Sequence, residues 1–212
     1  MAAIGFDVYG TLVDPLAMSG ALEPVAGERA GEMATVWRTK QLEYSFRRAL
    51  MGAYKNFDVC TRDALRYAAR ATGIDLGDDE ERRLIDAYLD LEPYPDVISG
   101  IDALQRQGHA LVAFSNGVES SLRALLSRSG VLEHLDGIVS VDGASRPSKP
   151  DPAVYRVSSR AARKPARRDA AGVEQLLGSS AHGKPGCTAW LRRDPLSSRS
   201  LGYRAGRRDR YD

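Results

Sequence analysis

The sequence predicts an α/β protein, with a Rossmann-like parallel sheet as its core and a helical cap subdomain inserted into that core. Strand-like and helix-like segments alternate from residue 97 onward, which is typical of parallel strands joined by helical crossovers. One strand-like run at the N-terminus is separated from them by a long stretch that has helical spacing only. We therefore expect a core formed by residues 1–13 and 96–212, and a cap formed by residues 14–95.

The expected core elements are short and apolar. Ala2–Val8 is closed by Gly10 and Thr11, as expected of a buried parallel strand that ends in a turn. After the cap we expect a helix at Val97–Gln107, a strand at His109–Phe114, a helix at Glu119–Ser129, a strand at Gly137–Val141 and a helix that starts within Pro152–Arg156.

The cap is expected to be helical throughout. Apolar residues recur along it at spacings of three to six: Val36, Leu42, Phe46 and Leu50. Two further amphipathic stretches, Ala64–Thr72 and Glu80–Leu91, are separated by glycines. No strand-like alternation interrupts this segment before Pro93.

Composition favours an ordinary globular protein. No apolar run approaches the length that spans a bilayer, and the N-terminus lacks the basic region of a secretory signal. The two cysteines, Cys60 and Cys187, form neither a disulfide framework nor a metal-ligand spacing. We therefore expect a cytoplasmic protein with no membrane partner.

Charge is divided unevenly along the chain. The net charge is +2, yet residues 1–155 contain 16 Lys and Arg against 23 Asp and Glu, while residues 156–212 contain 14 against 5. A basic tail of this kind often indicates nucleic-acid binding. Its segment Val157–Cys187 lacks interleaved aromatic residues and any recognised module, so we expect no nucleic-acid partner.

The strongest chemical signal is Asp7 within Phe6-Asp7-Val8-Tyr9-Gly10-Thr11-Leu12. A residue at the carboxyl end of a parallel strand lies where open α/β sheets bind ligands. Gly10 allows close approach of backbone amides to an anion, and the Thr11 hydroxyl can orient the carboxylate. The alternative is an aspartate that only caps a turn, which is a common use of this residue.

Three further segments favour the chemical interpretation: Phe114-Ser115-Asn116-Gly117 after a strand, Ser148-Lys149-Pro150-Asp151-Pro152 before a helix, and Trp37–Gly52 with Gln41-Leu42-Glu43-Tyr44 in the cap. With these segments, and with Leu91-Glu92-Pro93-Tyr94-Pro95-Asp96, the chain resembles the type II (S)-2-haloacid dehalogenases of the haloacid dehalogenase superfamily. The resemblance covers about residues 3–156.

The resemblance implies a role for each matching residue. Asp7 would be the nucleophile, Thr11 its hydroxyl neighbour, Arg38 the cation of the halide and substrate pocket, and Lys149 the lysine that balances the charge of Asp7. Substrate contacts are implied at further positions, with Ser115 and Asn116 at the substrate carboxylate: Val8, Tyr9, Arg38, Leu42, Phe57, Ser115, Asn116 and Tyr155.

The implied reaction is hydrolytic and needs no cofactor or metal. Asp7 would displace halide from C2 of a small (S)-2-haloalkanoic acid with inversion, and water would then cleave the ester to release an (R)-2-hydroxy acid. A halide leaves as a stable anion, so a nearby cation suffices and no proton donor is needed. A homodimer is one expected assembly, since dimers are common in the family.

Two alternatives stay open at this point. A superfamily phosphatase would usually carry a second aspartate two residues after the nucleophile, where this chain has Tyr9; loss of such a proton donor costs roughly 10²–10⁴ in rate. A degenerate, non-catalytic binding protein with a basic tail is the other alternative.

The family pattern fails beyond Arg156. The family continues with an apolar strand and a Val-Ser-Ser-Asn-x-Trp-Asp motif, whereas Val157–Cys187 offers no apolar strand and contains Arg163-Lys164-Pro165-Ala166-Arg167-Arg168. For Arg168–Gly178 a synonymous codon set exists that, read one base later, encodes Glu-Met-Leu-Leu-Val-Ser-Ser-Asn-Ser-Trp and then Asp or Glu. We therefore expect that roughly Val157–Cys187 is translated out of frame.

Overall fold

The computed structural model describes residues 3–142, Lys149, Val154, and the backbone of residues 173–177 and 188–192. Its helices and strands, together with three short 3-10 turns at Pro15–Ala17, Gly27–Arg29 and Leu132–His134, follow in this order: β1 Ala3–Phe6, α1 Met18–Ala26, α2 Ala30–Leu50, α3 Phe57–Ala71, α4 Asp78–Ala87, α5 Val97–Arg106, β2 Ala110–Ser115, α6 Glu119–Arg128, β3 Gly137–Ser140, β4 Val173–Leu177 and β5 Thr188–Arg192.

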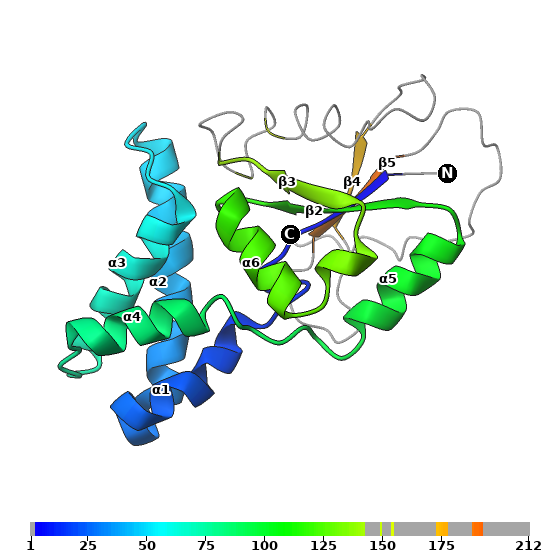
Figure 1. The fold of residues 1–212 in the computed structure, drawn as a ribbon. Coiled ribbons are helices and arrows are strands. Elements are labelled where there is room, and N and C mark those ends of the chain that lie inside the picture. The colour runs from blue at the N-terminus through cyan, green and yellow to red at the C-terminus, as the bar shows by residue number, and fades with distance from the viewer. Residues whose placement is uncertain (1–2, 143–148, 150–153, 155–172, 178–187, 193–212) are drawn as a thin grey trace, which may run out of the picture.

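The sheet has the order β3-β2-β1-β5-β4. β1 pairs with β2 and β2 with β3 in parallel, so that Phe6 lies opposite Ala113. Helices α5 and α6 lie on the same face of these strands (Figure 1). The expected parallel α/β core is thereby confirmed for β1 to β3, and the carboxyl ends of β1 and β2 lie side by side.

The last two strands depart from the expectation. The prediction that Val157–Cys187 contains no strand is wrong at Val173–Leu177, where β4 pairs antiparallel with β5. β5 in turn pairs antiparallel with β1. A ladder is made of backbone hydrogen bonds, so it does not require a continuous apolar run. The expected helix start at Pro152–Arg156 lies outside the described residues except for Val154.

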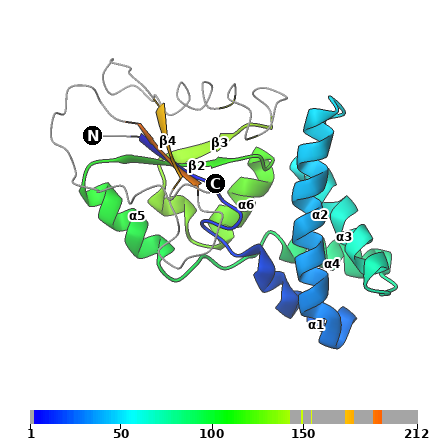
Figure 2. The ribbon, with the colours of Figure 1, turned by 180° about the vertical axis from the view of Figure 1, so that it is seen from behind.

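Helices α1 to α4 form a separate group beside the sheet (Figures 1 and 2). Two chain segments lead into and out of this group, and they lie side by side: Val13 forms an antiparallel bridge with Pro93, and the Tyr94 amide donates to the Leu12 carbonyl at 3.0 Å. The chain therefore returns to the core after α4 beside the segment by which it left the core after β1.

The buried face of α2 differs from the expected one. Phe46 and Leu50 are exposed, Leu50 to 87%, and Leu42 is half-buried. The buried residues of α2 are Ala30, Met33, Ala34, Trp37, Gln41 and Ser45. Spacing alone did not identify this face because Gln41 and Ser45 are polar, and a search for apolar periodicity passes over polar residues that are buried through hydrogen bonds.

Candidate active site

Asp7 directly follows β1, and its carboxylate is paired with Lys149. The Lys149 Nζ donates to Asp7 Oδ1 at 2.6 Å and to the Phe114 carbonyl at 2.7 Å. Both side chains are largely shielded, with exposed fractions of 27% for Asp7 and 13% for Lys149. Among the described residues, Lys149 is the one hydrogen-bond donor to this carboxylate, so none of them occupies Oδ2.

Asn116 holds the backbone of Lys149. Its Oδ1 accepts from the Lys149 amide at 2.8 Å, and its Nδ2 donates to the Lys149 carbonyl at 3.4 Å. The neighbouring Ser115 is 1% exposed, and its Oγ accepts from the Gly117 amide at 3.2 Å. Of the two residues expected at a substrate carboxylate, Ser115 therefore ends β2 and Asn116, directly after it, fixes the backbone of Lys149.

A tight turn follows Asp7. The Val8 carbonyl accepts from the amides of Thr11, Leu12 and Val13 at 3.2, 2.9 and 3.1 Å. Gly10 has a φ of 94°, a left-handed conformation that side chains other than glycine rarely adopt. The expected bond from Thr11 to Asp7 is not formed, since Thr11 Oγ1 is buried without a partner among the described residues.

Arg38 of α2 reaches across to this turn. Its Nη2 donates to the Tyr9 carbonyl at 2.8 Å, and its Nη1 donates to Gln41 Oε1 at 2.8 Å. A cation from the helical group is thereby fixed on the backbone two residues beyond Asp7.

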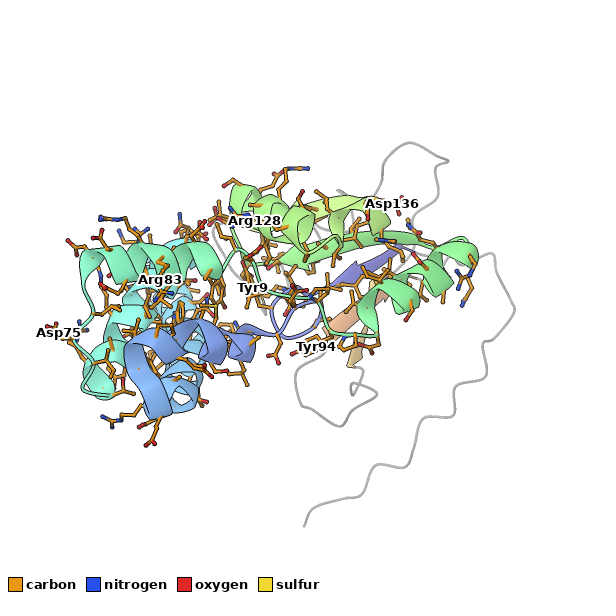
Figure 3. The ribbon with its side chains drawn as sticks, turned by 60° about the horizontal axis from the view of Figure 1, so that its bottom comes forward. Tyr9, Asp75, Arg83, Tyr94, Arg128 and Asp136 are labelled. Atoms are coloured by element: carbon orange, nitrogen blue, oxygen red, sulfur yellow. The ribbon has the colours of Figure 1, made fainter. Side chains whose placement is uncertain are left out.

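Aromatic side chains close the site on the cap side. Tyr9 is stacked on Phe57, with ring centroids 5.2 Å apart, and packs at 5.5 Å against Tyr88. Figure 3 shows Tyr9 at the junction between the helical group and the sheet. Burial, and next the neighbouring Tyr88, raise the pKa of the Tyr9 phenol well above its ordinary value of 10.0. Tyr9 therefore stays neutral, presents an apolar ring to the site, and is a poor proton donor.

Of the other expected contact residues, Val8 is fully buried and Leu42 is half-buried. Tyr155 lies outside the described residues. No three His, Cys, Asp or Glu side chains in the described part of the chain come together as a metal site would require. A search of the same residues finds no helix long and apolar enough to cross a bilayer.

Sequence reasoning missed two contacts between the helical group and the core. Ser121 Oγ of α6 donates to Asp58 Oδ2 at 2.6 Å, and the Tyr54 hydroxyl donates to the Asp142 carboxylate. Burial raises the pKa of the Asp58 carboxyl. These partners lie 63 and 88 positions apart, so no local pattern could have revealed them.

Comparison with known proteins identifies the family. Residues 1–168 match the model of the haloacid dehalogenase-like hydrolases. The chain belongs to this family. The resemblance expected from sequence is confirmed, and it extends twelve positions beyond Arg156. The end of the match lies within the basic segment that we expect to be out of frame.

The relatives of this haloacid dehalogenase-like hydrolase act on carbon–halide bonds. It is 39% identical over 158 residues to the (S)-2-haloacid dehalogenase of Pseudomonas sp. (strain YL), covering 74% of this chain and 68% of the relative. It is 36% identical to haloacetate dehalogenase H-2 of Moraxella sp. (strain B), covering 75% of this chain and 70% of the relative.

A solved structure, the L-2-haloacid dehalogenase of Xanthobacter autotrophicus with chloropropionic acid covalently bound, superimposes with a TM-score of 0.68 at 35% identity. The superposition covers 73% of this chain and 62% of that one. The chain therefore spans somewhat less than two thirds of the length of this neighbour. The fold class, a Rossmann-like core with helices inserted after the first strand, is confirmed.

Proposed function

We propose that this protein is an (S)-2-haloacid dehalogenase that converts small (S)-2-haloalkanoic acids into (R)-2-hydroxy acids. The observation that carries the proposal is the Asp7–Lys149 pair at the carboxyl end of β1, with Arg38 fixed on the Tyr9 carbonyl beside it. One carboxylate oxygen is held by a cation, and the other, which has no partner among the described residues, would attack. A second cation lies nearby for the departing anion.

The chemistry follows from this arrangement. Asp7 Oδ2 attacks C2 from the side opposite the halogen, so the C2–O bond forms as the carbon–halogen bond breaks and the electron pair leaves with the halide. A carboxylate is a weak nucleophile, and fixed orientation together with desolvation supplies the acceleration. Water then adds to the ester carbonyl carbon of Asp7, and the bond between that carbon and the ester oxygen breaks. The C2 alkoxide leaves and takes one proton of the water, the second proton goes to solvent, and the Asp7 carboxylate is regenerated. The inverted C2 centre is retained.

A phosphatase is disfavoured by the state of Tyr9. The residue stands where a superfamily phosphatase would carry its acid, and burial raises its pKa well above the ordinary tyrosine value. Protonating an alcohol leaving group from this phenol would be slow, whereas expelling a halide requires no proton.

The roles of individual residues extend the proposal. Asp7, Thr11, Arg38 and Lys149 carry the chemistry, and the contact residues named from the sequence line the substrate site. We also propose that residues 14–95 act as the cap and the remainder as the core, which agrees with the side-by-side Leu12–Val13 and Pro93–Tyr94 segments. A cytoplasmic location and a homodimer remain proposals that rest on the sequence.

The experiment is the Asp7→Asn variant, assayed for chloride release from (S)-2-chloropropionate. We expect no release, because a carboxamide oxygen is a far weaker nucleophile, with mass spectrometry to exclude deamidation back to aspartate. Asp14→Asn is the matched control, since Asp14 only caps the following turn by accepting from the Leu16 amide. Retained activity in Asp7→Asn would exclude Asp7 as the nucleophile.

Isotope labelling separates the two possible hydrolytic routes. A single turnover in ¹⁸O water should place label in the Asp7 carboxylate, because water attacks the ester carbonyl. Label found only in the hydroxy acid would mean that water attacks C2 directly, and the ester mechanism would be wrong.

A further inference from the structure

Gln41 is completely buried on the inner face of α2, one turn after Arg38. We propose that Gln41 is a positioning residue for Arg38, and that halide departure depends on this buried amide although it does not touch the substrate. The inference rests on the dehalogenation proposed above, in which Arg38 stabilises the leaving halide.

Both polar atoms of the Gln41 amide have hydrogen-bond partners. Its Oε1 accepts from Arg38 Nη1 at 2.8 Å and from the Tyr88 hydroxyl at 3.0 Å. Its Nε2 donates to Thr61 Oγ1 at 2.6 Å. Three segments of the helical group, α2, α3 and the residue after α4, therefore meet at one side chain.

The direction of every bond in this network is fixed by chemistry. An arginine side chain only donates, so the atom of Gln41 that faces it must be the oxygen. The Thr61 hydroxyl donates its one proton to the Phe57 carbonyl at 2.8 Å. Toward Gln41 it can therefore only accept a hydrogen bond. The amide consequently has one orientation, and Arg38 is held between Gln41 and the Tyr9 carbonyl.

The amide is neutral, and neutrality matters to Arg38. A glutamate at this position would set a buried carboxylate against the guanidinium, and attraction between charges is strong away from water. Arg38 would then be paired internally and would present less positive charge to a departing anion. Gln41 supplies a fixed acceptor without supplying that competing charge.

The test compares Gln41→Met and Gln41→Glu with wild type by single-turnover halide release from (S)-2-chloropropionate and (S)-2-bromopropionate. Thr72→Val is the matched control, because Thr72 is also fully buried in the helical group and bonds through its hydroxyl to the Ala68 carbonyl at 2.8 Å. It loses a comparable buried bond, yet it has no contact with Gln41 or Arg38 among those described.

Both Gln41 variants should slow chloride release by about 10- to 100-fold, the loss that misplacement of a catalytic group by about 1 Å produces. Bromide release should slow less, since bromide is the better leaving group and needs less stabilisation. Thr72→Val should leave the ratio of chloride to bromide rates unchanged. If the Gln41 variants lower both rates by the same factor, or stay within about twofold of wild type, the positioning role is wrong.

A second measurement does not depend on turnover. In ¹⁵N-labelled wild-type protein, the Arg38 guanidinium protons should exchange slowly and resonate separately, and in Gln41→Met they should exchange rapidly. Equal exchange in both proteins would overturn the inference. A wild-type chain that releases no halide but shows the expected exchange difference would contradict the proposed function and leave the positioning of Arg38 intact.

Discussion

Asp7 Oδ1 and Lys149 Nζ are 2.6 Å apart, and the same ammonium is tied to the Phe114 carbonyl at the end of β2. The lysine therefore fixes Asp7, the proposed nucleophile, relative to the neighbouring strand and balances its charge. Rotation of the carboxylate is restrained, which gives the second oxygen the defined direction that the proposed attack on C2 needs.

Lys149→Met should lower single-turnover halide release by about 100-fold or more, because the carboxylate loses both its orientation and its compensating charge in a shielded site. Lys55→Met, at an exposed position in the cap, is the control and should retain wild-type rates. Equal rates in the two variants would show that Lys149 contributes only to structure.

Arg38→Lys should reduce kcat/KM for (S)-2-chloropropionate by about 10-fold or more. A guanidinium reaches Tyr9 and Gln41 with separate nitrogens, whereas an ammonium is a compact, strongly hydrated point charge without the planar fork. Arg47→Lys is the control, since Arg47 is 71% exposed and, among the described residues, pairs with Glu43 alone. A near-wild-type specificity constant for Arg38→Lys would exclude Arg38 from the halide site.

Dehalogenation should persist in EDTA. The expected reaction needs neither a Lewis acid nor a proton donor, and position 9 holds a tyrosine where a phosphatase would have an aspartate. Chloride release with and without EDTA, and with added magnesium, measures this. A strong loss of chloride release in EDTA that magnesium restores would favour the phosphatase alternative. Efficient hydrolysis of p-nitrophenyl phosphate would favour it as well.

Asp58→Asn should stabilise the protein at neutral pH. Burial raises the pKa of the Asp58 carboxyl above its ordinary value of 3.8, and Asp142 raises it further, against the opposing effects of Ser121 and Arg62. The folded state therefore binds this proton more tightly than the unfolded state, and stability falls as pH rises through the folded pKa. Asparagine does not titrate, and its oxygen can still accept from Ser121.

The measurement is Tm between pH 4 and pH 7. The Tm of Asp58→Asn should exceed that of wild type at pH 7, and the difference in Tm should shrink toward pH 4. Asp75→Asn, at an exposed position, should show no such trend. A destabilised Asp58→Asn at pH 7 would mean that the carboxylate is better accommodated there than burial indicates.

The native gene should be in another reading frame over roughly Val157–Cys187, which the nucleotide sequence across codons 143–190 would show. The family match ends at residue 168, where the alternative codon reading of Arg168–Gly178 begins. We expect nucleotide sequencing to reveal a frame change that restores the Ser, Asn and Asp of the family motif, and the intact mass of the native protein to agree. An active native enzyme that retains Arg163–Arg168 in frame would end this idea.

Much of the core could be predicted because its signals are local. Val97, Glu119 and Gly137 begin elements where the sequence indicated. Asp7 and Ser115 could be placed together because the ends of adjacent parallel strands must meet. Arg38 and Lys149 came from resemblance rather than from any periodicity.

The features that could not be predicted depend on long-range partners. Gln41 is buried only because Thr61, Tyr88 and Arg38 satisfy it, and those partners lie up to 47 positions away. The antiparallel pairing of β5 with β1 could not be predicted either, since backbone hydrogen bonds place few requirements on which side chains a strand carries. The missing Thr11–Asp7 bond shows that proximity in a motif does not fix which hydrogen bond forms.

Lys149 and Asp7 are separated by 142 positions, so nearly the whole described chain lies between the two members of the pair. Bringing together residues this distant costs chain entropy that local contacts must first offset, and contacts of this kind form late in folding. During synthesis Asp7 leaves the ribosome early, and its carboxylate has no lysine partner until residue 149 has been made. In the proposed reaction, halide release would therefore require a completed core, and a partly folded or truncated intermediate should release no halide even where its first strand and helices have already formed.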